Sequence, residues 1–206
     1  GGVAGERTTP LARVIKVHAA MMFGGGHSAL FFDGRLVSSA GAAMANGMTI
    51  DSMDAHDGHP LTKGHAGCGV LPALIAIIQQ QELTLSGTEF LTTLVVGYEI
   101  AIRAGIALHA TAPDYHTSGA WVAIAAAAMG ARLMDMSKPQ FRHAIGIAEY
   151  HGPRSQMMRV VDAPTMFKDG SGWGAMAGVS AAYLAQSGFT GAPAISVEET
   201  EYFNDR

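Results

Sequence analysis

The 206-residue sequence predicts an all-α fold, and three observations support that prediction. Apolar residues recur with helical spacing in several long segments, beginning with residues 71–87. Two capping boxes, at residues 86–89 and 137–140, mark helix starts, because their side chains satisfy backbone amides that lack partners within the helix. Signals for strands are weak. We therefore expect one helical domain over residues 1–206, built as a multi-helix bundle whose Ala and Gly residues let helices pack closely.

The expected helices follow one another along the chain. The first contains Leu71 and tolerates Pro72 in its opening turn. Three more cover residues 117–134, the segment after the second capping box, and residues 172–188, where glycine provides a stop. Residues 29–37 are the one candidate β-hairpin, with a turn at Asp33–Gly34. The helix that starts at the first capping box has an expected core face of Phe90, Leu91, Leu94, Val95, Tyr98 and Ile102.

Composition argues against several classes of protein. The net charge is −4 and the 13 Lys and Arg residues are dispersed, so we expect no nucleic-acid partner. A single cysteine, Cys68, leaves no internal disulfide and too few thiolates for an iron–sulfur cluster held by this chain alone. We find no signal peptide and expect no apolar run of membrane-spanning length. These features together predict a cytoplasmic protein without a membrane partner.

Titratable residues gather in the segment DAHDGHPLTKGHAG, residues 54–67. This segment runs into a glycine-rich helix start, where free amides and the helix dipole favour a carboxylate or a phosphate. A metal cage, a proton-transfer site and a solvated loop are all compatible with this composition. A zinc site is the less favoured of these, because the spacing matches no common helical pattern and thiolates are absent from the segment. The imidazoles can transfer protons near neutral pH without a metal.

Two later segments have a similar character. His116 and Thr117 stand just before another Ala/Gly-rich helix, although a capping loop with an incidental histidine would look the same. Lys168 precedes a glycine-rich helix start, where its charge opposes the helix dipole. It therefore indicates an anionic ligand, with a solvated lysine as the alternative. His151 and Arg154 lie at a helix end, a place that suits cations without any further function.

In these segments the sequence resembles the MmgE/PrpD family, which includes 2-methylcitrate dehydratase and cis-aconitate decarboxylase. The resemblance rests on the order and spacing of four blocks, and it extends over nearly the whole chain. The chain has His65-Ala66-Gly67 where the family often has His-Pro-Gly or His-Pro-Ser. The blocks are AAMANGMTIDSMDAHDGHPLTKGHAGCGVLPALIAI, SGTEFLTTLVVGYEIAIRAGIAL, YHTSGAWVAIAAAAMGARLM and MFKDGSGWGAMAGVSAAYLAQSGFTGAP.

The resemblance implies an architecture and a chemistry. Family members have a large helical domain and a smaller α/β lid domain, form homodimers, and work without a metal or organic cofactor at a site between the domains. By this comparison the chain is expected to be a partial helical domain that lacks the first helix and the lid. By position in the family, we expect catalytic roles for Asp54, Asp57, His65, His116 and Lys168, and substrate contacts from His59, Gly64, Gly67, Thr117 and Arg154.

The function that the resemblance implies is that of a cofactor-independent lyase for a small di- or tricarboxylate. In this hypothesis Lys168 and the amides at residues 64–69 hold the carboxylates. One of His65 and His116 removes the proton next to a carboxylate, the other protonates the departing hydroxyl, and an aspartate orients the imidazole. A dehydratase of 2-methylcitrate, active in propionate metabolism, is the leading reading. A decarboxylase, an isomerase or epimerase of a similar acid, and an inactive module for carboxylate binding or dimerisation remain alternatives.

Overall fold

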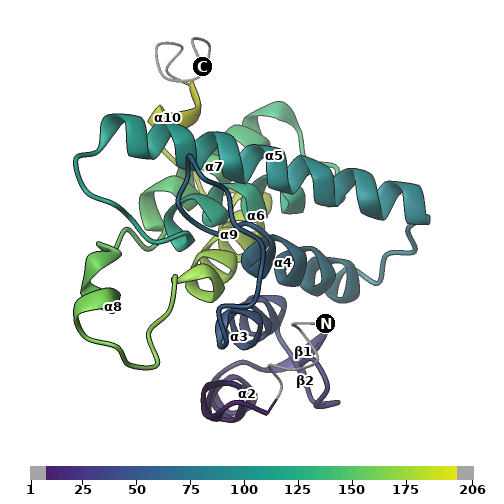
Figure 1. Cartoon of the computed structure of the whole chain (residues 1–206). Coiled ribbons are helices and arrows are strands. Elements are labelled where there is room, and N and C mark those ends of the chain that lie inside the picture. Colours follow the sequence, from purple (N-terminus) through teal and green to yellow (C-terminus); the bar gives the residue numbers. More distant parts are fainter. Residues whose placement is uncertain (1–7, 199–206) are drawn as a thin grey trace.

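The computed structural model describes residues 8–198, where helices dominate and a small two-stranded sheet is the other regular element (Figure 1). This confirms the all-α prediction. The sheet pairs β1 (Gly24–Ala29) with β2 (Leu36–Val37) in antiparallel orientation. The helices are α2 (Pro10–Met22), α3 (Ser39–Asp51), α4 (Gly67–Gln80), α5 (Gly87–Thr111), α6 (Gly119–Leu133), α7 (Lys138–His151), α8 (Met158–Asp162), α9 (Ser171–Gln186) and α10 (Ile195–Glu198).

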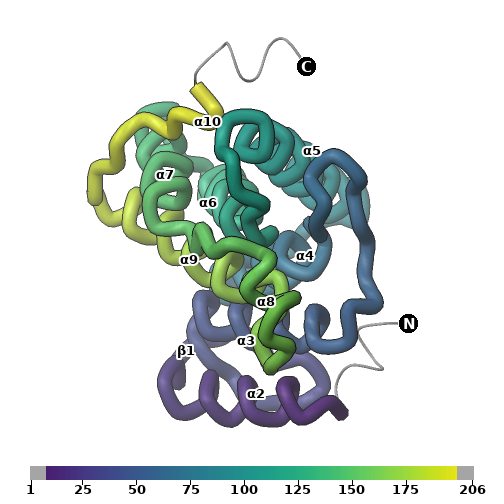
Figure 2. Tube along the Cα trace, turned by 60° about the vertical axis from the view of Figure 1, so that its left-hand side comes forward, coloured from purple at the N-terminus to yellow at the C-terminus, as the bar shows by residue number. Residues whose placement is uncertain are grey.

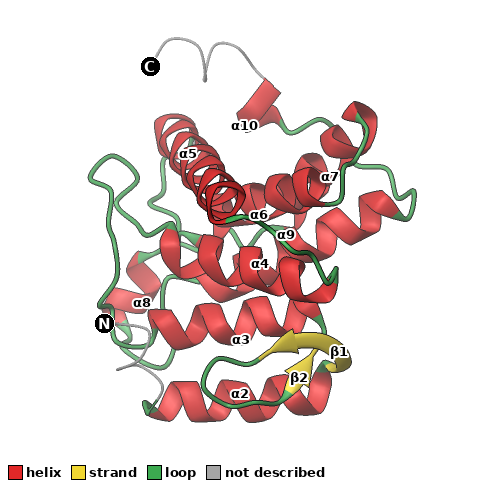
Figure 3. Cartoon of the chain, turned by 90° about the vertical axis from the view of Figure 1, so that its right-hand side faces the viewer, coloured by secondary structure: helices red, strands yellow, loops and turns green. Residues whose placement is uncertain are grey.

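The helices form successive layers, from α2 through α3 and α4 to α5, with the hairpin at the edge beside α2 and α3 (Figure 3). Helix α6 is the centre of the bundle, and each of its residues from Gly119 to Ala131 is buried. Helices α4, α5, α7 and α9 surround it. A helix that is apolar on all sides is stable only when neighbours cover all of its faces.

Helices α6 and α9 run parallel and approach closely along their length. A side chain at Gly174 would meet the backbone of Gly119, and one at Gly178 would meet the backbone of Ala123. Further along, Gly130 faces Ala182 in the same way. Small residues therefore let the two backbones come together, as the Ala- and Gly-rich sequence predicts.

The capping boxes at Ser86 and Ser137 are both present, and the helices that follow them start where the sequence predicts. The hairpin is confirmed in part: its second strand lies within the predicted segment, but its first strand, Gly24–Ala29, ends where the predicted one began, and residues 30–35 form the connection. Helices α2 and α3 went unpredicted. Helix α3 has almost no amphipathic pattern because it is buried on nearly every side, so periodicity gave no signal.

The predicted core face of α5 is wrong in part, since Leu91 and Val95 are 59% and 60% exposed. The buried side of α5 is instead a row of small residues that includes Gly97 and Ala101. Small residues allow α5 to sit close to α6, and the bulky apolar side chains are left at the margin. The expectation of no segment long enough to cross a bilayer is also wrong by length and composition, because α5 meets both criteria. Core helices of soluble proteins often meet them too.

Candidate active site

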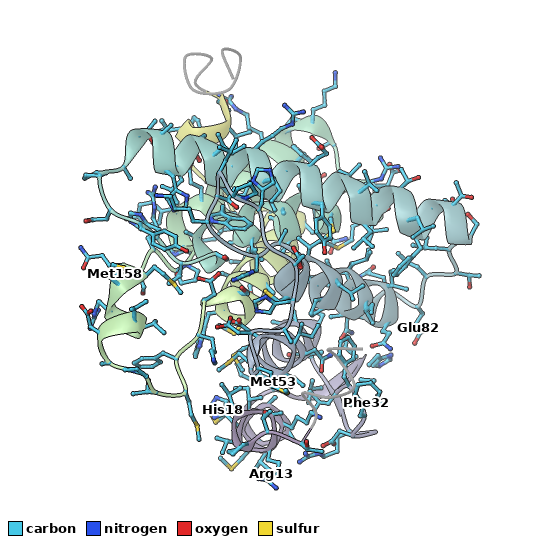
Figure 4. All side chains as sticks on the ribbon, in the orientation of Figure 1. Arg13, His18, Phe32, Met53, Glu82 and Met158 are labelled. Atoms are coloured by element: carbon cyan, nitrogen blue, oxygen red, sulfur yellow. The ribbon has the colours of Figure 1, made fainter. Side chains whose placement is uncertain are left out.

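Four helix ends meet at one place in the bundle, the C-terminal end of α3 and the N-terminal ends of α4, α6 and α9. A Cβ at Gly47 of α3 would meet Gly172 of α9 and the carbonyl of Cys68 in α4. A Cβ at Gly119 of α6 would meet Gly170, just before α9. In Figure 4, Met53 marks the end of α3 at this convergence. Three helix N-termini therefore bring free amides and positive dipole ends to one region.

Each of these three N-termini is met by an aspartate of the chain. The Asp57 carboxylate accepts the amide of Gly67 at 3.2 Å, at the start of α4. The Asp169 carboxylate accepts the amide of Ser118 at 3.2 Å, before α6, and Asp51 accepts the amide of Asp169 at 3.1 Å, before α9. At residues 64–69, which the sequence assigned to substrate carboxylates, the amides of Ala66 and Gly67 are thus engaged by Asp57 and that of His65 by Ser118. Gly67 as a substrate contact stays a prediction, and it requires displacement of Asp57.

His65 is held on both sides of its ring. Its Nδ1 hydrogen-bonds the carbonyl of Asp57, which can only accept, so Nδ1 carries the proton in the neutral ring. Its Nε2 then has a free lone pair and faces the Asp169 carboxylate at 3.9 Å. The His65 backbone amide donates to Ser118 Oγ at 2.8 Å, which fixes the loop on α6. The side chain is 26% exposed, so His65 is fixed in orientation and accessible from solvent.

A second imidazole, His56, lies against His65 with ring centroids 3.9 Å apart. His56 Nε2 lies 2.9 Å from Asp51 Oδ1 and 3.5 Å from Asp54 Oδ1. Burial disfavours charge on this ring, but the Asp51 hydrogen bond and the nearby carboxylates outweigh it and raise the pKa of His56. Asp54 itself is exposed and has a positive φ of 59°, a conformation that aspartate tolerates better than most residues.

Asp169 is almost fully buried, with only 2% of its surface exposed, as is Asp51. Both of its oxygens bind Ser118, one at the amide and one at the hydroxyl. Burial is the main reason that the pKa of Asp169 rises to about 6, and the charge of Asp51 adds to the rise against the Ser118 hydrogen bonds. Asp169 therefore changes charge near the pH at which histidines titrate.

His116 is held in a similar way to His65, with Nδ1 at 2.7 Å from the Asp114 carbonyl. Its backbone amide donates to His109 Nε2 at 3.2 Å, so the neutral His109 ring carries its proton on Nδ1. Burial is the main cause that lowers the pKa of His109. His116 also pairs with Gln156 through its backbone. This pairing attaches His116, the residue before Thr117, to the segment that precedes α8.

An open cavity of about 460 Å³ adjoins the helix ends, between α2, α3, α9 and the segment around α8. Asp51, Thr117 and Lys168 line it, and so does Arg159, a cation that sequence reasoning did not single out. Thr117 Oγ1 is buried without a partner among the described residues. Two cations and a hydroxyl therefore line the cavity together with Asp51. His65 does not line it and contacts Asp169 instead.

Of the predicted site residues, Thr117 and Lys168 line this cavity. The others lie outside its lining: Asp54, Asp57, His59, Gly64, His65, Gly67, His116 and Arg154. Gly64 packs so closely on Ser118 that a side chain could not fit, and its carbonyl accepts the His59 amide at 3.0 Å. Arg154 lines a separate small hollow beside Trp121. The roles of His59, Gly64 and Arg154 in substrate binding stay predictions, and the arrangement gives each of the first two a part in shaping the loop.

Sequence reasoning missed several members of the cluster. His56 lies inside the titratable segment, but nothing in the sequence distinguishes it from its neighbours. Asp51 ends an otherwise apolar helix, and Asp169 directly follows Lys168, so each gave a weak signal. The buried Ser118 and the exposed Arg159 gave none, because only the packing of distant segments gives them a role.

A metal remains chemically possible at two overlapping groups. Asp54, His56 and His65 each offer a ligand atom within 4.8 Å of the others, as do Asp51, His56 and Cys68. Burial is the main reason that the pKa of the Cys68 thiol is raised well above its usual value, which disfavours the thiolate that zinc requires. The first group is therefore the better candidate of the two.

Part of the chain is similar in sequence to curated proteins. The chain is 32% identical over 115 residues to the cis-aconitate decarboxylase-like protein oryM of Aspergillus oryzae, a match that covers 52% of this chain and 24% of that protein. It is 27% identical over 121 residues to cis-aconitate decarboxylase of Aspergillus terreus, covering 56% of this chain and 25% of that protein. The matched part thus spans about a quarter of the length of these curated relatives.

The family comparison covers more of the chain. The model of the MmgE/PrpD N-terminal domain matches residues 1–205, which include all four helix ends and the loops that carry the aspartates and histidines. The helical architecture is that of this N-terminal domain. The chain therefore belongs to the MmgE/PrpD family.

Proposed function

We propose that this chain provides the acid–base site of a cofactor-independent lyase, which removes a proton next to a carboxylate of a small di- or tricarboxylate. The observation that carries the proposal is the His65 ring, whose Nδ1 hydrogen-bonds a carbonyl and whose Nε2 lies 3.9 Å from the Asp169 carboxylate. Such an imidazole is ready to accept a proton. The family includes dehydratases and decarboxylases, which supports a reaction of this general type.

In the proposed first step, His65 Nε2 takes the proton from the carbon and leaves a carbanion whose charge spreads into the adjacent carboxylate. Asp169 lies 3.9 Å from Nε2 and stabilises the imidazolium that forms. Lys168 and Arg159 line the cavity and stabilise the charge that develops on the substrate carboxylates. General-base help of this kind contributes about a hundred- to ten-thousand-fold to the rate.

In the second step the substrate loses hydroxide from the neighbouring carbon, and His116 protonates it to water. This is the dehydratase reading, with 2-methylcitrate as the model substrate and a homodimer in the cytoplasm as the expected form. A decarboxylase of a related acid is the second candidate, and the names of the curated relatives favour it. Isomerases and epimerases of such acids would share the proton removal, so the outcome depends on which group leaves.

The proposal is tested by turnover in D2O with 2-methylcitrate, citrate and cis-aconitate, followed by NMR. The assay uses the 206-residue chain and, in parallel, the longest protein that its gene encodes. We expect solvent deuterium next to a carboxylate together with loss of water or carbon dioxide. Absence of both exchange and turnover from every preparation would contradict the proposal, and a helical module that only binds carboxylates or dimerises would then be the better description.

The metal alternative has its own measurement. Elemental analysis of the purified chain, before and after chelation, is expected to find no stoichiometric zinc and no change of activity. Zinc that is held by Asp54, His56 and His65, and whose removal abolishes turnover, would replace the proposed mechanism with a metal-assisted one.

A further inference from the structure

The cavity beside Lys168 is charged at few points and apolar over most of its wall. Lys168, Arg159 and Asp51 are its charged lining residues. A small polyacid needs cations and hydrogen-bond donors around all of its carboxylates, because a carboxylate against an apolar wall is costly. Thr117, Ser155, Gln156 and Thr165 add neutral donors to the lining, but most of the wall surface is apolar. The apolar wall is formed by Leu11, Met48, Val160, Met166, Phe167 and the ring of Trp173.

Several of these apolar side chains have no role in the packed interior. Helix α8 has no buried residue, and Figures 1 and 2 show that its segment forms an arm lying outside the main bundle. Phe167 is 72% exposed and Trp173 is 47% exposed, although both line the cavity. Apolar side chains that stabilise no core and surround an open cavity indicate an apolar ligand group.

The volume is consistent with such a group. About 460 Å³ corresponds to roughly fifteen water molecules at ~30 Å³ each. We propose that the substrate of this site carries an alkyl group of several carbons beside its carboxylates, an inference that rests on the proposed function. The carboxylates bind at Lys168 and Arg159, and the alkyl group lies along the wall formed by Val160, Phe167 and Trp173.

The hydrophobic effect gives the expected size of this preference. Each methylene removed from water contributes a factor of about four in affinity until the wall is fully covered. The probes are succinate, 2-butylsuccinate and 2-octylsuccinate, titrated into the 206-residue chain by calorimetry or NMR. We expect 2-butylsuccinate to bind at least tenfold more tightly than succinate, and 2-octylsuccinate to bind more tightly again.

Two pairs of variants separate the apolar wall from the charged end. Phe167→Ser is expected to reduce the preference for 2-octylsuccinate over succinate about fivefold or more, whereas Phe189→Ser, at a 51% exposed position outside the lining, leaves it unchanged. Lys168→Met is expected to weaken every diacid at least tenfold, whereas Lys138→Met at the start of α7 has no effect.

Three results would overturn the inference. Equal affinity for all three diacids would show that the wall does not contact the ligand. Binding of 1-octanol as tight as that of 2-octylsuccinate would show that the cations play no part. No binding of any probe at millimolar concentration would make the apolar wall a surface for another protein segment instead.

The outcome is distinguishable from that of the proposed function. Alkyl-dependent binding without any turnover or deuterium exchange would remove the proposed reaction and keep the inference. Turnover that is independent of alkyl length would keep the proposed reaction and remove the inference about the alkyl group.

Discussion

Helices α6 and α9 form one parallel pair with two unlike halves. Along the pair, Gly178 meets Ala123 and Ala126, and no charged side chain lies between the helices in the part of the chain described. At the head of the pair, Ser118 and Asp169 are buried as completely, but Ser118 is polar and Asp169 is ionisable. The same close approach that excludes water from the middle of the pair places the first turns of both helices side by side at the head.

The difference shows how the fold positions the site. Small residues fix the distance between the helices, and this distance brings the loop before α6 against the loop before α9. The amide of Gly119 donates to the carbonyl of Asp169 at 3.1 Å, and the Asp169 carboxylate binds Ser118 in return. Stability should therefore depend chiefly on the middle of the pair, and chemistry should depend on the head.

The largest effect is expected at the head, in catalysis. His65→Gln should lower turnover about a hundred- to ten-thousand-fold in whichever preparation is active, because the base is lost, and His116→Gln should do the same if it is the acid. Thermal unfolding should change little, since His65 is partly exposed. His151→Gln, at the exposed end of α7, is the matched control. Unchanged turnover of either site variant would remove that histidine from the mechanism.

The next effect is expected in the middle of the pair, in stability. Gly178→Val places a side chain against the backbone of Ala123 and should lower the free energy of unfolding by about 3 kcal/mol. Gly87→Ala, in the first turn of α5 with open space around it, is the control and should be neutral or slightly stabilising. Urea unfolding of both variants measures the difference. A Gly178 variant as stable as the parent chain would mean that close approach does not hold the pair.

A pH effect is expected from Asp169 at the head. Its pKa is about 6 in the folded chain against 3.8 ordinarily, so the folded state binds more protons than the unfolded state between these values. Stability should therefore fall as pH rises from about 4 to 6, by about 2–3 kcal/mol in total. Asp169→Asn should remove this slope, which urea unfolding at several pH values would detect. A slope that persists in the variant would assign it to another group.

His56 should add a decline at higher pH. Its raised pKa means that the folded state favours the charged ring, so this stabilisation is complete below pH 6.5 and is lost as the pH rises through the folded pKa. His56→Gln should abolish the decline above pH 6.5 and leave the one between pH 4 and 6. The same titration by urea unfolding tests both variants.

The smallest effect is expected far from both halves, at the capping box of α5. Ser86→Ala removes the hydroxyl that accepts the Glu89 amide at 3.2 Å and should cost about 1 kcal/mol in unfolding free energy. Thr92→Ala, on the exposed face of the same helix, should stay within about 0.5 kcal/mol of the parent. A loss at Ser86 as large as that at Gly178 would weaken the contrast between local and packing effects.

The sequence alone determined the helical class, the two capping boxes, the small-residue packing and the family. These features are local or periodic, so they can be read along the chain. It also identified the three segments that carry His65, His116 and Lys168. Helix α3 and the true buried face of α5 were missed, because burial on most sides and close packing through small residues override the apolar periodicity. Helix α2 was missed although it is amphipathic.

Only the tertiary structure decided which groups meet. Asp51, Ser118 and Asp169 lie far apart in sequence, and each becomes part of the cluster because four helix ends converge. The structure also decided that Asp57 engages the amide of Gly67 at the start of α4 and that Asp169 engages the amide of Ser118 just before α6. The physical reason is that a buried carboxylate needs donors on several sides, and those donors come from segments whose proximity no local pattern records.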